Sequence, residues 1–194
     1  MRMNDEILDR FQEGLDAAVA AGLPEPNAML LATSSTDARP GARVVLLKSH
    51  DADGFVFYTN LGSRKARELA ENPRACLVFW WRELARQVII DGVVRPVSDA
   101  EADAYFATRP RGSQIGAWAS MQSTPLPSRE VFMARIREFE QRFEGRDVPR
   151  PPYWSGFRVE AERVEFWYGR EYRWHERIEY RAGDDGWQRS MLYP

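Results

Sequence analysis

The chain has 194 residues, of which 44% are hydrophobic and 29% charged, and its formal net charge is −2. This length and composition suit one folded domain over residues 1–194 and exclude a fibrous or disordered protein. The small negative charge argues against a nucleic-acid-binding protein, and no apolar run approaches the roughly 20 residues that span a bilayer. Because MRMNDEILDR lacks the apolar core of a signal peptide, we expect a cytoplasmic protein.

The first half of the chain predicts one helix followed by several strands. Apolar residues recur at helical spacing over 4–21, and Gly22 and Pro24 end that pattern. A polar, helix-prone stretch over 63–71 interrupts the strands, and Asp91-Gly92 predicts a turn or bulge. The β-like runs cover 28–33, 42–48, 54–60, 75–81 and 87–97.

The second half predicts helices and then strands. Ser98 and Glu101 form a capping box, because a hydroxyl and a carboxylate can each bind a free amide at a helix start. We therefore expect a helix over about 99–107. Further helices are expected over 112–120 and 129–143, an irregular segment over 148–152, and β-like runs over 156–168, 171–181 and 186–194.

These elements lack the regular strand–helix alternation of a parallel sheet. We expect a β-rich α+β domain with about six or seven antiparallel strands and surrounding helices. A closed or partly closed antiparallel barrel is the favoured architecture, and a Greek-key sandwich is the alternative.

Two basic segments in the first half can bind phosphate. Strand alternation over 43–48 places Arg43 and Lys48 on opposite faces, where they can contact two anionic groups. An ordinary buried strand with charged ends is the alternative. Gly62 to Lys65 begins the helix over 63–71, where free amides and the helix dipole favour an anion, unless this is only a solvated basic first turn.

A loop between two predicted helices is rich in hydrogen-bond donors. Tyr105, Arg109, Arg111 and Ser113 can surround a second phosphate with a phenol, guanidinium groups and a hydroxyl. The alternative is a helix–helix connection with exposed arginines.

Near the C-terminus, alternation along a predicted strand places Arg173, His175 and Arg177 on one face and Trp174 and Glu176 on the other. Three cationic or titratable groups on one face would repel each other unless an anionic or electron-rich ligand lies between them. A lone histidine is otherwise usually a surface or core residue.

Several reaction classes are disfavoured. The sequence has no G-x-S-x-G, no H-E-x-x-H and no G-x-G-x-x-G, and its single cysteine, Cys76, has no partner for a disulfide or a metal site. We expect Cys76 to be a buried, unreactive thiol, because it lies in an apolar run. The remaining features suit one phosphorylated cofactor and one phosphorylated substrate.

Eight segments share their order and spacing with one known family. They are RVVLLK (43–48), FYTNLGSRKA (57–66), RQV (86–88), YFATRPRGSQIGAW (105–118), QS (122–123), FWYG (166–169), RWHER (173–177) and the terminal LYP. From about residue 26 to the C-terminus, the chain thus resembles the pyridoxamine 5′-phosphate oxidase family. This resemblance implies an antiparallel Greek-key split barrel that binds FMN, and a homodimer with FMN at the subunit interface.

The resemblance also implies roles for individual residues and no metal site. The FMN contacts would be Arg43, Val44, Val45, Leu46, Leu47, Lys48, Tyr58, Thr59, Arg64, Lys65, Gln87, Gln122, Ser123, Trp167 and Arg177. The substrate contacts would be Lys48, Tyr105, Arg109, Ser113, Arg173 and His175. Arg173 and His175 would be the catalytic residues nearest the reacting carbon.

The implied activity is that of a pyridoxal 5′-phosphate synthase of vitamin B6 metabolism. Pyridoxamine or pyridoxine 5′-phosphate would pass a hydride to FMN, and O2 would reoxidise the flavin and yield H2O2. The alternatives are a phenazine-type FMN oxidase of another pathway and a non-catalytic protein that binds FMN or pyridoxal 5′-phosphate.

The chain departs from the family at the N-terminal segment and at Trp174, and also locally at Trp80-Trp81 and Ala85, where no functional consequence is expected. The segment over 1–25, an expected N-terminal helix, is shorter than the family's usual N-terminal region, so contacts that cover the active site would be absent or replaced. Trp174 stands where the family commonly has leucine, which implies altered packing with retained chemistry.

Overall fold

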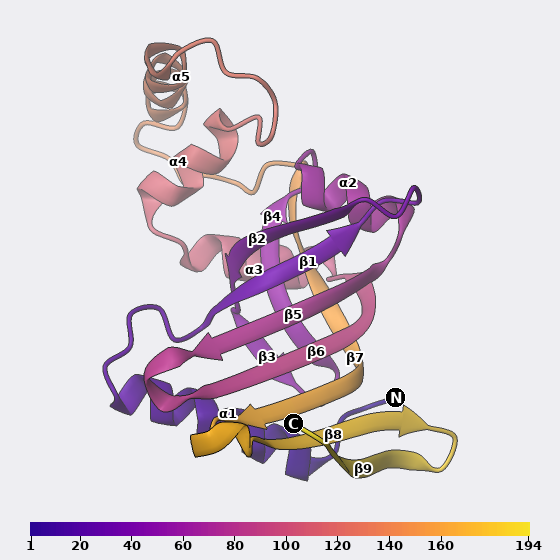
Figure 1. Ribbon diagram of the computed structural model, residues 1–194. Helices are drawn as coiled ribbons and strands as arrows, with labels where there is room; N and C mark the ends of the chain where they lie inside the picture. The colour runs from indigo at the N-terminus through magenta and orange to yellow at the C-terminus, as the bar shows by residue number, and fades with distance from the viewer.

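The computed structural model describes residues 1–194 as one curled antiparallel sheet with five α-helices around it (Figure 1). The strands are β1 (Ala28–Ser34), β2 (Pro40–Leu46), β3 (Ser49–Asp51), β4 (Gly54–Asn60), β5 (Arg74–Trp81), β6 (Arg86–Pro96), β7 (Trp154–Tyr168), β8 (Glu176–Gly183) and β9 (Gly186–Leu192). The helices are α1 (Asp5–Ala20), α2 (Arg64–Glu71), α3 (Asp99–Thr108), α4 (Arg111–Ala119) and α5 (Arg129–Arg142). No helix is long and apolar enough to cross a membrane.

Strand β7 connects the two parts of the sheet. The strand order is β2-β1-β5-β6-β7-β4-β3, and β8 and β9 extend from the far end of β7. The β6–β7 register shifts between Asp91 and Gly92, which confirms the predicted bulge. A Cβ on Gly92 would lie 2.1 Å from the carbonyl oxygen of Glu160, so only glycine lets the two strands approach there.

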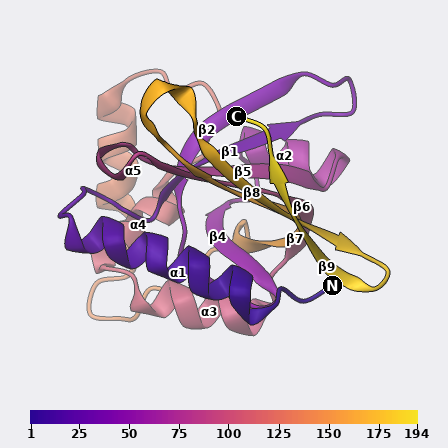
Figure 2. The same cartoon turned by 60° about the horizontal axis from the view of Figure 1, so that its bottom comes forward.

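The main core lies inside the curled sheet, and α1 closes one end of it (Figure 2). The side chain of Asn4 caps α1 by accepting a hydrogen bond from the amide of Ile7 at 3.0 Å. Phe11 on α1 is fully buried and makes edge-to-face contacts with Phe55 and Phe79, each with ring centroids 5.0 Å apart. The helix is therefore part of the core.

A second, smaller core joins α3, α4 and α5 at the opposite end of the molecule. Phe106, Ile115 and Phe139 are buried in it together with Trp154, the first residue of β7. This core fixes the helices against the end of the barrel, where the cavity described below opens.

Most expected elements are confirmed, including the antiparallel split barrel and all of the expected helices. The count of six or seven strands was low, since nine form and the short β3, which pairs with β4, was not expected as a separate strand. The capping box is half right. Ser98 accepts a hydrogen bond from the amide of Glu101 at 3.1 Å, but the Glu101 carboxylate accepts one from Arg158 at 3.2 Å instead of binding back to residue 98.

The strand expected over 171–181 is wrong in its first part. Glu171–Arg173 forms a short 3-10 turn in which Tyr172 and Arg173 have positive φ angles of 54° and 63°. Residues in that region of backbone space cannot continue a strand, so β8 begins only at Glu176. Arg173, His175 and Arg177 therefore do not alternate along one strand.

The expected buried cysteine is only half-buried. Burial, followed by the neighbouring Asp91, raises the pKa of the Cys76 thiol to about 12. The thiol is therefore protonated near neutral pH, which agrees with the expected lack of reactivity.

Replacing Phe11 with alanine should lower the free energy of unfolding by about 3–5 kcal/mol, because it leaves a cavity between α1 and the sheet. Val19→Ala on the same helix is the matched control, since Val19 is 59% exposed. Its effect should stay within about 0.5 kcal/mol. Urea unfolding at one fixed protein concentration measures both, and equal effects would contradict a core role for α1.

Candidate functional site

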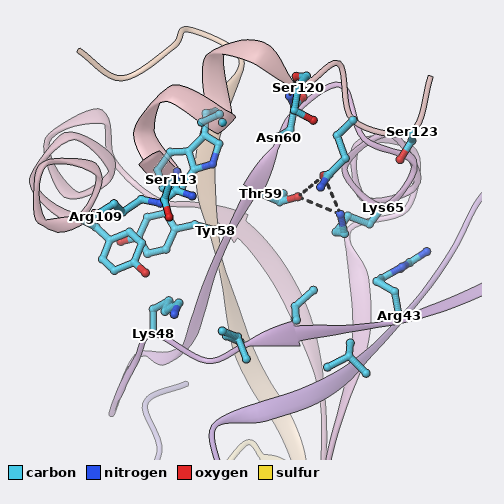
Figure 3. A pocket seen from close by; sticks show the side chains of 18 of the residues that line it. Arg43, Lys48, Tyr58, Thr59, Asn60, Lys65, Arg109, Ser113, Ser120 and Ser123 are labelled. Carbon is cyan, nitrogen blue, oxygen red and sulfur yellow. Dashed lines mark hydrogen bonds between the residues drawn. The ribbon is translucent and has the colours of Figure 1, made fainter. Parts of the chain in front are cut away.

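A cavity of about 980 Å³ opens at the end of the barrel that the helices cover (Figure 3). It lies between β2, β4, the start of α2 and the segment from α3 to the end of α4. The expected ligand contacts that line it are Arg43, Val44, Val45, Leu46, Lys48, Tyr58, Thr59, Arg64, Lys65, Tyr105, Arg109, Ser113, Gln122 and Ser123.

One side of the cavity is built around a buried lysine. The Lys65 ammonium donates to Thr59 Oγ1 at 3.0 Å, to Gln122 Oε1 at 3.1 Å and to Ser63 Oγ at 3.4 Å, and Lys65 is 9% exposed. Burial, then the charge of Arg43, lowers the pKa of Lys65. All three acceptors are neutral, so the ammonium has no negatively charged hydrogen-bond partner. An anion in the cavity would supply one.

Two arginines stand beside Lys65 and share one carboxylate. Arg43 Nη2 donates to Glu68 Oε2 at 2.9 Å, and Arg64 Nε donates to Glu68 Oε1 at 2.7 Å. Glu68 is 6% exposed and does not line the cavity. Burial alone would raise the pKa of Glu68, but hydrogen bonds from Thr33 and from the two arginines hold it below its usual range.

The sequence analysis missed Glu68. Its spacing of four residues from Arg64 on a predicted helix was the available signal, since such pairs face each other. The contact with Arg43 joins residues 25 positions apart, which only the folded sheet brings together.

The segment after α4 completes this side of the cavity. Ser123 Oγ accepts a hydrogen bond from the amide of Arg64 at 3.1 Å, and Ser123 has a positive φ of 69°. Asn60 donates to the carbonyl of Ser120 at 3.1 Å, which attaches the end of α4 to β4. The expected pair Gln122 and Ser123 is thus held close to the start of α2.

A second group of donors lies across the cavity, with Lys48, Arg109 and Ser113 as its members (Figure 3). The Arg109 guanidinium packs over Trp154 at 4.7 Å, and its Nη1 is buried without a hydrogen-bond partner. Burial lowers the pKa of Arg109. A buried guanidinium nitrogen without an acceptor suits a ligand that brings an acceptor of its own.

Parallel aromatic rings form the wall beside Arg109. Tyr58 lies parallel to Tyr105 at 4.1 Å and to Trp154 at 5.3 Å, and Tyr105 lies 6.2 Å from Trp154, measured between ring centroids. The sequence analysis predicted both tyrosines but missed Trp154. Arg111, which the sequence placed in this donor-rich loop, instead donates to the carbonyls of Phe143 and Arg146, just after α5.

The remaining expected residues lie elsewhere. Leu47 is 4% exposed and belongs to the main core. A distal cluster, defined here as Gln87, Trp167, Arg173, His175 and Arg177, does not line the cavity. Within it, Gln87 on β6, Trp167 on β7 and Arg177 on β8 are direct neighbours across the sheet.

His175 has a defined environment in the distal cluster. Its ring lies 4.6 Å from Trp167, and its Nδ1 accepts a hydrogen bond from the amide of Arg170 at 3.1 Å. Because Nδ1 must be unprotonated to accept, a neutral His175 carries its proton on Nε2. The ring therefore presents an N–H donor on its other side.

Arg177 is held by a buried carboxylate. Its Nε donates to Glu165 Oε1 at 2.7 Å, and its Nη1 donates to the carbonyl of Tyr193 at 3.0 Å. Glu165 is 1% exposed and also binds Arg163. The hydrogen bond that Arg177 donates to Glu165 is the main reason that the pKa of Arg177 is raised.

The cavity and the distal cluster lie at opposite ends of β7. Trp154 lines the cavity and begins the strand, and Trp167 lies near its other end. At about 3.3 Å per residue, roughly 40 Å of strand separates them. Figure 1 shows α2, α4 and α5 toward one end of the molecule and β8 and β9 at the other. One protomer alone therefore does not bring the expected site residues together.

Comparison with known proteins identifies two matching regions. Residues 15–143 match the family model described as pyridoxamine 5′-phosphate oxidase. Residues 154–194 match the model described as the pyridoxine 5′-phosphate oxidase C-terminal dimerisation region.

Two relatives are named pyridoxine/pyridoxamine 5′-phosphate oxidase. The protein from Zymomonas mobilis is 58% identical over 184 residues, covering 95% of this chain and 96% of its own length. The protein from Rubrobacter xylanophilus is 57% identical over 185 residues, covering 95% of this chain and 85% of its own.

Solved structures share the fold. PhzG from Burkholderia lata 383, in complex with tetrahydrophenazine-1-carboxylic acid, has a TM-score of 0.92 and 34% identity, covering 96% of this chain and 92% of its own. An FMN binding protein from Nostoc punctiforme, related to pyridoxamine 5′-phosphate oxidase, has a TM-score of 0.78 and 15% identity over the full length of both chains, which indicates the fold alone.

Replacing Glu165 with glutamine should lower the free energy of unfolding by about 2 kcal/mol, because the half-buried Arg177 guanidinium loses its charged partner and Arg163 loses one of its three carboxylates. Glu162→Gln on the same strand is the control, since its pairing with Arg74 is exposed. That change should cost less than about 1 kcal/mol. Thermal unfolding measures both, and no difference between the two variants would contradict the importance of the buried pair.

Proposed function

Because this chain belongs to the pyridoxamine 5′-phosphate oxidase family, we propose that it oxidises pyridoxamine and pyridoxine 5′-phosphates to pyridoxal 5′-phosphate with FMN as cofactor. The chain is an FMN-dependent oxidoreductase of vitamin B6 metabolism. The relatives that carry this name are 57% and 58% identical, whereas the phenazine protein PhzG is 34% identical.

The observation that carries the proposal is the presence of two anion-competent groups on opposite sides of one cavity. Lys65 is a buried ammonium with only neutral hydrogen-bond partners, and Arg109 has a buried nitrogen with no partner. Both features suit phosphate oxygens. Two such groups, separated by aromatic and aliphatic walls, fit a phosphorylated cofactor beside a phosphorylated substrate.

Each ligand has its own set of contacts in the proposal. Lys65, Arg43 and Arg64 bind the FMN phosphate, together with the segment at Gln122 and Ser123. The substrate phosphate is bound by Lys48, Tyr105, Arg109 and Ser113. These assignments put the two phosphates on opposite sides of the cavity, so that the two rings meet between them.

The proposed active unit is a homodimer with FMN at the subunit interface. The distal cluster lies in or beside the segment that matches the family's dimerisation region, about 40 Å of strand from the cavity. In a two-fold symmetric dimer, the distal cluster of one protomer can face the cavity of its partner. Each site then combines residues from both chains.

When bound, FMN accepts a hydride from the substrate and passes electrons to O2. The chain supplies binding and orientation. His175, with Nδ1 occupied by the Arg170 amide, directs its Nε2–H toward an acceptor on a ligand. Arg173 places a positive charge beside the ring of the substrate and stabilises negative charge that develops on that ring.

A spectrum of the purified protein tests the reaction. It should show flavin absorbance that bleaches when pyridoxamine 5′-phosphate is added without oxygen, and admitting air should restore the colour and produce peroxide. Bound flavin without bleaching would indicate a binding protein. Turnover of an unphosphorylated ring, with none of pyridoxamine 5′-phosphate, would indicate a phenazine-type oxidase.

Mixing inactive variants tests the shared site. Arg109→Ala and His175→Ala should each lose most turnover while retaining FMN, because neither residue binds the FMN phosphate in the proposal. Co-expression of the two should restore activity to about one quarter of sites, since half of the dimers then contain one intact site. Arg109→Ala with Lys48→Ala is the control pair and should restore none, because both changes affect the same cavity. Equal recovery by the two pairs would contradict a site built across the interface.

A further inference from the structure

We propose that Glu68 is a positioning residue that holds the Arg43 and Arg64 guanidinium groups in the orientation needed for the FMN phosphate. The inference rests on the proposed FMN site and adds a residue that does not line the cavity. Glu68 acts through the two arginines, since its carboxylate lies behind them and is buried.

Both oxygens of the Glu68 carboxylate accept hydrogen bonds within the chain. Glu68 Oε1 accepts from Arg64 Nε at 2.7 Å, and Oε2 accepts from Arg43 Nη2 at 2.9 Å and from Thr33 Oγ1 at 2.5 Å. Arg43 Nη1 also donates to Thr33 Oγ1 and, at 3.4 Å, to the carbonyl of Leu31. These bonds fix one edge of each guanidinium and leave its other N–H groups for a ligand.

The backbone leaves room for this arrangement at Gly41. A Cβ built on Gly41 would lie 2.6 Å from Arg43 Nη2 and 2.9 Å from Glu68 Oε1. Any other residue at this position of β2 would therefore displace the ion pair. The atoms that would have to move are the ends of flexible side chains, so an alanine here perturbs the pair with little demand on the fold.

The charges also fit a phosphate monoester. Arg43, Arg64 and Lys65 with one buried Glu68 leave a net formal charge of +2, which complements a phosphate group carrying about −1.5 to −2 at pH 7. Without Glu68, the three neighbouring cations would repel each other, and the arginine side chains would turn outward to water. Arg64 is the freer of the two arginines, with its side chain 59% exposed against 21% for Arg43.

Two effects of removing the Glu68 charge have opposite signs. The site becomes more positive, which favours an anion, but both guanidinium groups lose the contact that orients them, which disfavours it. Solvent at the open side of the cavity screens the added positive charge. The two freed guanidinium groups, however, must be ordered again each time a ligand binds. Orientation therefore dominates.

The test compares FMN with riboflavin, which lacks the phosphate, on the full-length chain stripped of flavin. Flavin fluorescence quenching gives both dissociation constants. Glu68→Gln should weaken FMN binding about tenfold or more, as expected for lost charge-assisted hydrogen bonds, and leave riboflavin binding unchanged. Gly41→Ala should act in the same direction although it retains every charge. Glu71→Gln, at the exposed end of the same helix, is the control and should change neither ligand.

Unchanged or tighter FMN binding by Glu68→Gln would overturn the inference, because charge would then outweigh orientation. Equal losses for FMN and riboflavin would also overturn it by indicating a general structural role. If Glu68→Gln does not fold, as judged by its thermal unfolding, Gly41→Ala decides in the same way. Failure of the unaltered chain to bind FMN would contradict the proposed function itself, which separates the two tests.

Discussion

The pairing of β7 along both of its edges is the constraint on which the rest of the structure depends. Its first half pairs with β4 and β6, and its second half pairs with β6 and β8. One 15-residue strand thus reaches from the cavity to the distal cluster. The bulge at Asp91 and Gly92 bends this long pair, so that the sheet curls around the core instead of lying flat.

Buried carboxylates hold the arginines at both ends of this strand. Glu68 stands behind Arg43 and Arg64 near the cavity, and Glu165 stands behind Arg177 in the distal cluster. Each carboxylate is almost fully buried, which is unfavourable unless all its oxygens are bonded. The gain is in preorganisation, because a guanidinium held on one edge loses less freedom when a ligand binds its other edge.

Lys65 and Arg109 follow a different rule. Lys65 is buried among neutral groups, and Arg109 has one nitrogen with no acceptor, so neither charge is satisfied within the chain. Such groups cost stability in the protein alone and recover it when an anion binds. The contrast separates cations that a buried carboxylate pairs and orients from cations that have no carboxylate partner before a ligand binds.

The sequence by itself determined the local elements and the types of residue in the site. Periodicity located the helices and most strands, and the donor types at Lys65 and Arg109 indicated phosphate, because these features depend on near neighbours along the chain. The 3-10 turn at Tyr172 and Arg173 was missed. Both residues have positive φ angles, but neither is a glycine, and the surrounding aromatic run looks like a strand, so nothing in the sequence indicates a turn there.

Only the tertiary structure decided which of these residues meet. It brought Glu68 to Arg43, placed Trp154 beside Arg109, and left the distal cluster far from the cavity. Those contacts join positions that are distant in the chain and depend on strand order and register, which local patterns do not encode.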